Sequence, residues 1–158
     1  MSMPDWGMTL TDAQIADVIA YLQTTFVDAG VDATAAMCPQ PRNTAQASAE
    51  IYGQVNPLAP TPANLAAGKR LYEQAARPLA CQSCHGVKGD GLGPLGAAFA
   101  VPPRNFTCVQ TMKEIPDGQL FWVIRNGVPA AGMPPYRDLS DEEIWQLVSY
   151  LRQFYEKG

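Results

Sequence analysis

A short stretch near the middle of the chain, Cys81-Gln82-Ser83-Cys84-His85, places two thiols and an imidazole within about one helical turn. The C-x-x-C-H spacing is the attachment signature of a c-type haem. Two thiols three positions apart can each form a thioether with a haem vinyl group, and the adjacent imidazole then lies beneath the iron. The motif predicts one covalent haem c bound through Cys81 and Cys84, with His85 as a metal ligand.

Two other uses of paired cysteines fit the sequence less well. A zinc site requires a second Cys or His pair, but His85 is the only histidine, and Cys38 and Cys108 are isolated in the sequence. A thioredoxin-like redox pair requires a βαβ context, and no strand-rich pattern surrounds the motif. Haem attachment is therefore the favoured interpretation.

Around this motif the sequence resembles the class I c-type cytochromes, over about residues 61–155. The segment "TPANLAAGKRLYEQ" resembles the first helix of that family, "CQSCHGVKGDGLGPLG" its haem-binding segment, and "NGVPAAGMPPY" the loop that supplies the sixth ligand. A long gap before Cys81 and an expanded loop, "AAFAVPPRNFTCVQTM", depart from the family without touching the ligand motifs. The resemblance implies an all-α cytochrome c fold around one covalent haem, formed by residues 61–158.

The sixth iron ligand is expected to be a methionine, because the single histidine is already used. The resemblance places this role on Met133, with Met112 as the second candidate and a purely core-filling Met133 as the alternative. A His/Met pair suits one-electron transfer and leaves no open site for a substrate. The protein is thus expected to be an electron carrier or the cytochrome subunit of an oxidoreductase, and no enzyme itself. The competing hypothesis is a haem enzyme or sensor, peroxidase-like, whose methionine leaves the iron.

Two further residues are assigned roles around the haem. By resemblance, the carbonyl of Pro94 accepts the proximal imidazole N–H, which would fix its orientation. Arg104 follows two prolines and is the first choice to pair with a haem propionate. The other basic residues considered for that role are Lys88, Arg125 and Arg137.

Local signals predict the helices that must position these groups. Thr61-Pro62 is an N-cap followed by proline at the first helical position. The resemblance places Gly68 where this helix crosses the last one, and a residue without a Cβ would let the two backbones approach closely. The last helix begins with a capping box formed by Ser140 and Glu143. Its expected apolar stripe is Ile144, Leu147, Val148 and Leu151. A short helix over about 117–126 would bring Leu120, Trp122 or Ile124 to the porphyrin, with Trp122 better explained as core.

The beginning of the chain repeats its end. "MPDWGMTLTDAQIADVIAYL" at 3–22 parallels "MPPYRDLSDEEIWQLVSYL" at 133–151, including a capping box of Thr11 and Gln14. The favoured interpretation is that residues 1–26 are a helical arm resembling the end of another cytochrome c domain, with residues 27–60 as a linker. An appendage that packs on its own domain or a partner, and an accidental likeness, are the alternatives.

Cysteine usage and composition indicate the compartment and the partners. Haem attachment of this type occurs outside the cytoplasm, where Cys38 and Cys108 are expected to form a disulfide, so a periplasmic location is predicted. The net charge is −4, and residues 1–60 hold one basic and six acidic residues, which argues against nucleic-acid binding. No apolar run reaches the roughly 20 residues of a transmembrane helix. Redox proteins, including other subunits of a membrane-associated complex, are the expected partners.

Overall fold

The computed structural model describes residues 11, 13–14, 16–18, 38–41 and 44–156. The chain forms two compact units, Met1–Ala35 and Ala36–Gly158. In the first unit the backbone N–H of Thr11 donates to Gln14 Oε1 at 2.9 Å and the N–H of Gln14 donates to Thr11 Oγ1 at 3.3 Å, which confirms the predicted capping box. The other residues of the repeat, Met3 among them, lie outside the described residues.

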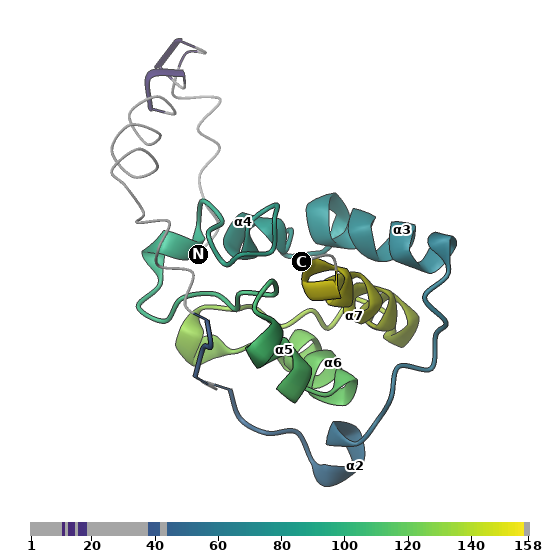
Figure 1. The fold of residues 1–158 in the computed structure, drawn as a ribbon. Coiled ribbons are helices and arrows are strands. Elements are labelled where there is room, and N and C mark those ends of the chain that lie inside the picture. Colours follow the sequence, from purple (N-terminus) through teal and green to yellow (C-terminus); the bar gives the residue numbers. More distant parts are fainter. Residues whose placement is uncertain (1–10, 12, 15, 19–37, 42–43, 157–158) are drawn as a thin grey trace. The chain divides into compact units, whose positions relative to one another are not determined.

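Among the residues that the structure describes, the named elements of the second unit are all helices or helical turns, joined by loops (Figure 1). Its elements in chain order are α2 (Ala49–Tyr52), α3 (Pro62–Arg70), the π-helical turn η4 (Leu71–Ala75), α4 (Gln82–His85), the 3-10 turn η5 (Gly96–Ala98), α5 (Val109–Glu114), α6 (Asp117–Asn126), the 3-10 turn η6 (Pro129–Ala131) and α7 (Asp141–Glu156). Within the described ranges, β pairing is limited to one bridge between Val128 and Met133. The predicted all-α class is confirmed. No helix in these ranges is both long and apolar enough to cross a bilayer.

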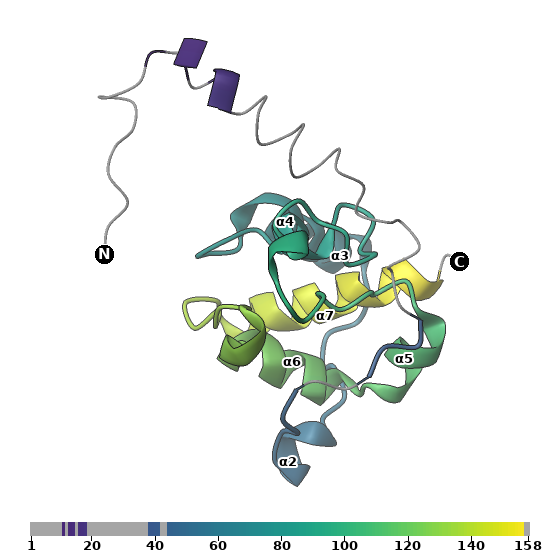
Figure 2. The ribbon, with the colours of Figure 1, turned by 90° about the vertical axis from the view of Figure 1, so that its left-hand side faces the viewer.

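Helix α7 is the central element of this unit and lies between α3 and α6 (Figure 2). It begins at the predicted capping box, in which the Ser140 N–H donates to Glu143 Oε2 at 2.8 Å and the Glu143 N–H donates to Ser140 Oγ at 3.2 Å. The predicted apolar stripe is buried, namely Ile144, Leu147, Val148 and Leu151. A local cap and a 3.6-residue repeat therefore suffice to place this helix.

Helix α3 crosses α7 at Gly68, as the sequence predicted. A Cβ at this position would come within 2.7 Å of the Gln146 carbonyl carbon and 2.9 Å of Tyr150 Cβ. The start of α3 is also as predicted, because Thr61 Oγ1 accepts the N–H of Asn64 and Pro62 occupies the first turn. The missing side chain of Gly68 is what lets the two backbones touch.

The expectation of a linker over residues 27–60 is wrong for the part that is described, since residues 38–41 and 44–60 pack on the helical unit. Cys38 forms a disulfide with Cys108, with their Cα atoms 5.5 Å apart, so that predicted pairing is confirmed. The buried Ala47 donates its N–H to Gln119 Oε1 at 2.9 Å. Asn56 donates its side-chain amide to the carbonyl of Trp145 in α7 at 2.9 Å. Its richness in Ala, Pro, Thr and Gln made this segment resemble a linker, whereas hydrogen bonds from polar groups and a disulfide attach its described part.

Replacing Cys38 and Cys108 together by serine is expected to lower the free energy of unfolding by about 3 kcal/mol, because the disulfide closes a long loop and restricts the unfolded chain. Denaturant unfolding of the haem-loaded protein would measure this loss. Reductant should lower the stability of the wild type by a similar amount and leave the double variant unchanged. Equal unfolding midpoints for wild type and variant would contradict the prediction.

Candidate cofactor site

The second unit encloses an apolar cavity that brings together most of the residues selected from the sequence. Cys81, Cys84, His85, Met133 and Arg104 all line it. Its apolar wall is formed mainly by Phe99, Val101, Phe106, Leu120, Val123, Ile124, Val128, Leu147 and Leu151. Leu120 and Ile124 of α6 thus face the cavity as expected, whereas Trp122 does not line it and is half-buried elsewhere.

The C-x-x-C-H motif is held in a single helical turn. Cys81 precedes α4, and its carbonyl accepts the N–H of His85 at 2.9 Å. The chain then turns sharply at Gly86, whose φ of 81° is one that residues with a Cβ rarely adopt. This turn leaves both thiols and the imidazole bordering the same cavity.

The two thiols of the motif are unpaired and neutral. Neither Cys81 nor Cys84 is in a disulfide, and burial raises the pKa of the Cys81 thiol to about 12. Burial also raises the pKa of Cys84. Reactive cysteines of redox pairs have lowered pKa values, so this environment argues against a thioredoxin-like function for the motif.

The imidazole of His85 is oriented by the backbone. Its Nδ1 lies 3.0 Å from the carbonyl oxygen of Arg104, and since a carbonyl can only accept, Nδ1 carries the proton. The lone pair is then on Nε2, the form that a metal requires. Burial lowers the pKa of His85 to about 4, which keeps the ring neutral at pH 7. The ring of Phe106 stacks on it with centroids 4.6 Å apart.

The expectation that the Pro94 carbonyl accepts the His85 proton is therefore wrong, because Arg104 provides the acceptor. Pro94 is exposed and does not line the cavity. The expanded loop returns against the motif instead, held by a hydrogen bond from the Phe106 N–H to the Gly89 carbonyl at 2.6 Å. Gly91 makes room for this return, since a Cβ there would lie 2.7 Å from the Pro103 carbonyl oxygen.

The segment that carries Met133 is held by the backbone on both sides. Val128 and Met133 exchange two hydrogen bonds, at 2.9 and 3.2 Å. The Tyr136 hydroxyl donates to the Leu79 carbonyl at 2.6 Å, which fastens this segment to the residues just before the C-x-x-C-H motif. Met112, the second candidate, is fully buried in the core and does not line the cavity. The geometry thus favours Met133 over Met112.

The four basic residues considered as propionate partners differ in their hydrogen bonds and in whether they line the cavity. Arg104 lines the cavity and donates to the Gln40 and Pro41 carbonyls at 3.4 and 3.2 Å, and burial lowers its pKa. Arg125 donates to the Arg137 carbonyl and to the carboxylate of Asp141, away from the cavity. Lys88 and Arg137 are exposed and do not line it. Of these four basic residues, Arg104 is the one that lines the cavity and could meet a charged group inside.

Three residues of the supposed linker also line the cavity, namely Gln40, Pro41 and Thr44. None of the three was predicted from the sequence. The one signal that could have found them is the pairing of Cys38 with Cys108, which brings this part of the chain to the expanded loop.

The residues present fit a c-type haem. Two neutral thiols, an imidazole with a free Nε2, a thioether and an apolar wall share one cavity, which is the donor set and surrounding that such a group requires. Among the described residues, no cluster of three or more His, Cys, Asp or Glu side chains could hold another metal ion.

The side chain of Tyr72 holds the backbone directly after the C-x-x-C-H motif, and this contact can be tested by mutation. Its hydroxyl is fully buried and donates to the Gly86 carbonyl, next to His85, at 2.6 Å. Tyr72→Phe is expected to lower the free energy of unfolding by about 1 kcal/mol, measured by denaturant titration, because the carbonyl keeps only its bond from Gly89. Tyr52→Phe serves as the control, since Tyr52 has no hydroxyl hydrogen bond within the described ranges. Equal losses in both variants would contradict the assignment.

A family model described as "Cytochrome C oxidase, cbb3-type, subunit III" matches residues 63–151. A solved structure, the "Kuenenia stuttgartiensis reducing HAO-like protein complex Kustc0457/Kustc0458", is similar with 28% identity and a TM-score of 0.55. The match covers 97% of this chain and 64% of that one, so this chain spans less than two thirds of its length. No curated protein matches the chain.

Proposed function

Since the chain belongs to the family described as cytochrome C oxidase, cbb3-type, subunit III, we propose that it transfers single electrons through one covalently bound haem c. Cys81 and Cys84 would form the two thioethers. His85 and Met133 would be the axial ligands. Membership in a cytochrome c family makes haem-based electron transfer the expected activity, and the ligand set is the part that we add.

The observation that carries the proposal is the convergence of these four side chains on one apolar cavity. His85 enters it as a neutral ring with its proton on Nδ1, so Nε2 needs no deprotonation to bind a metal. Hydrogen bonding of the Nδ1 proton to the Arg104 carbonyl also raises the basicity of the ring. Bound with one imidazole and one thioether ligand, the haem would exchange single electrons at a raised potential.

The surrounding side chains would keep water and reactants away from the ligands. The cavity wall is mostly aliphatic and aromatic, and the backbone bonds between Val128 and Met133 hold the thioether segment in place. Arg104 retains guanidinium donors beyond its two carbonyl bonds, which supports its assignment as the partner of a propionate.

The competing hypothesis, a haem enzyme or sensor with a displaceable methionine, has less support. Such an activity needs an acid or base near the reacting ligand. In the described part of the chain, the lining residues include no carboxylate, no lysine and no histidine other than His85. The proposal therefore remains that the protein is not itself an enzyme.

The partners and the location are proposed from the same features. The similar solved structure is a two-protein complex, which supports a role as one subunit or domain of a larger redox assembly with other redox proteins as partners. The Cys38–Cys108 disulfide supports a periplasmic location. We also keep the hypothesis that residues 1–26 correspond to the end of another cytochrome c domain.

Absorption spectroscopy of the purified protein tests the proposal directly. We expect haem that stays with the denatured chain, a far-red sulfur-to-iron band in the oxidised form, and no spectral change when carbon monoxide is added to the reduced form. A high-spin spectrum that changes with carbon monoxide would mean an open iron and would support the enzyme or sensor hypothesis instead.

A further inference from the structure

We propose that Gln40 is a positioning residue for the ligand His85, acting through the peptide group that follows Arg104. The inference rests on the proposed function, because it concerns how the proximal ligand of the proposed haem is held. Gln40 lies outside residues 63–151, so the family model does not account for its contacts with the loop around Arg104.

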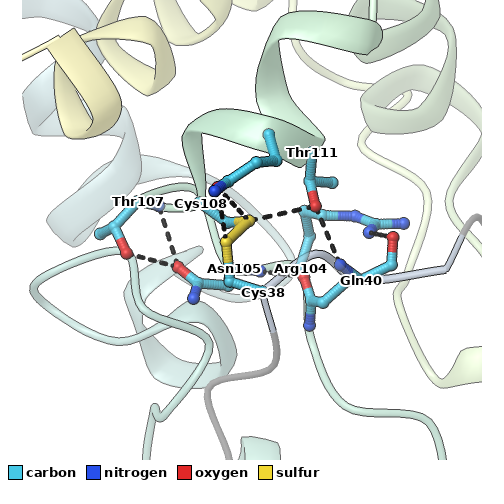
Figure 3. Close-up of a disulfide and its surroundings, with 8 residues drawn as sticks. Cys38, Gln40, Arg104, Asn105, Thr107, Cys108 and Thr111 are labelled. Atoms are coloured by element: carbon cyan, nitrogen blue, oxygen red, sulfur yellow. Dashed lines mark hydrogen bonds between the residues drawn. A yellow bond between two sulfur atoms is a disulfide. The ribbon is translucent and has the colours of Figure 1, made fainter.

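The side-chain amide of Gln40 binds the backbone on both sides of Arg104. Figure 3 shows Gln40 beside Arg104 and Asn105, close to the Cys38–Cys108 disulfide. Its Nε2 donates to the Pro103 carbonyl at 3.1 Å, and its Oε1 accepts the N–H of Asn105 at 2.7 Å. The Asn105 N–H and the Arg104 carbonyl belong to one planar peptide group and point in opposite directions. Gln40 thus holds one side of the group whose other side accepts the Nδ1 proton of His85 at 3.0 Å.

This arrangement sets the strength of the hydrogen bond to His85 as well as its direction. Hydrogen bonds arranged in a chain polarise one another, so an engaged Asn105 N–H makes the Arg104 carbonyl a better acceptor. A better acceptor raises the basicity of the imidazole and its electron donation to the metal. Loss of the Gln40 amide would weaken that donation and raise the reduction potential.

The backbone of Gln40 is also held in place, because its N–H and its carbonyl both form hydrogen bonds. Its backbone N–H donates to Thr111 Oγ1 at 2.9 Å, and its backbone carbonyl accepts from Arg104 Nη1 at 3.4 Å. Two residues earlier, Cys38 is covalently joined to Cys108. The disulfide and the Thr111 bond hold the segment, while only the side-chain amide reaches the peptide group that binds His85.

The test is Gln40→Met, which keeps the length of the side chain and removes its polar atoms. The matched control is Thr111→Val, which removes the acceptor of the Gln40 backbone N–H and leaves both bonds of the side-chain amide. Both variants would be examined as the haem-loaded full chain, by redox titration of the absorption spectrum and by proton NMR of the exchange of the His85 Nδ1 proton in D2O.

We expect Gln40→Met to raise the reduction potential. The equilibrium constant for reduction should increase severalfold, up to about tenfold, and a tenfold increase corresponds to about 59 mV for a one-electron couple. Its Nδ1 proton should exchange faster. Thr111→Val should change neither measurement, although both variants lower the thermal stability.

The inference is overturned if Gln40→Met keeps the wild-type potential and exchange rate, or if Thr111→Val shifts both as much. Should Gln40→Met not fold with haem, Gln40→Asn decides, since it is one methylene shorter and is not expected to reach both Pro103 and Asn105. An unchanged potential in that variant also overturns the inference. A different observation would contradict the proposed function, namely a wild-type absorption spectrum without the features of His/Met ligation.

Discussion

Met133→Ala is expected to leave the haem attached while opening the sixth position of the iron. In the proposed function Cys81 and Cys84 attach the haem, whereas the thioether of Met133 is the proposed ligand that closes the site. The far-red band should disappear, carbon monoxide should bind to the reduced form, and the potential should fall by on the order of 100 mV, because axial ligation is a main determinant of haem potentials. Absorption spectra and redox titration measure all three effects.

Met112→Leu is the matched control for this prediction. Met112 is fully buried in the core and does not line the cavity, so a replacement of similar volume should cost less than about 1.5 kcal/mol of stability and keep the wild-type spectrum. Retention of the far-red band in Met133→Ala, or its loss in Met112→Leu, would show that the ligand assignment is wrong.

Gly68→Val is expected to lower the free energy of unfolding by on the order of 5 kcal/mol, comparable with the whole stability of many small domains. At the α3–α7 crossing, the first added atom would already overlap the Gln146 backbone. A carbonyl group in the middle of a helix cannot rotate away as a side chain can. Denaturant unfolding of the haem-loaded protein would measure the loss of stability. A low yield of folded protein is also expected.

Gly53→Ala is the control for the glycine substitution. Gly53 follows α2 with a φ of −80°, and a Cβ there would meet its nearest atom, the Ala49 carbonyl oxygen, at an ordinary 3.4 Å. Its stability should stay within about 0.5 kcal/mol of the wild type. A comparable loss in both glycine variants would mean that the helix crossing is not the cause.

Features that depend on residues close together along the chain were predictable from the sequence. The C-x-x-C-H motif, the capping boxes at Thr11 and Ser140 and the apolar stripe of α7 each depend on spacing along the chain. The helix crossing at Gly68 was predictable because the resemblance places this glycine there, and a residue without a Cβ lets two backbones approach closely. The pairing of Cys38 with Cys108 was predictable because the other two cysteines were already assigned to the haem.

The acceptor of the His85 proton was not predictable, because it depends on the path of a loop. Pro94 is near His85 in the sequence, but Arg104 is near it in space, since Gly89 and Gly91 let the expanded loop return against the motif. Contacts of this kind depend on the absence of side chains at some positions and on hydrogen bonds between distant backbones, which leave no periodic pattern.

The sequence by itself determined the chemistry of this protein: the residues that could attach and ligate a haem, and the helices that carry them. Only the tertiary structure decided which part of the chain surrounds those residues. The supposed linker forms part of the cavity wall because a disulfide, the side-chain amide of Gln40 and the guanidinium of Arg104 join it to the loop behind His85. Covalent motifs are encoded by local spacing, whereas the groups that orient them are brought together by packing and by hydrogen bonds between residues far apart in the chain.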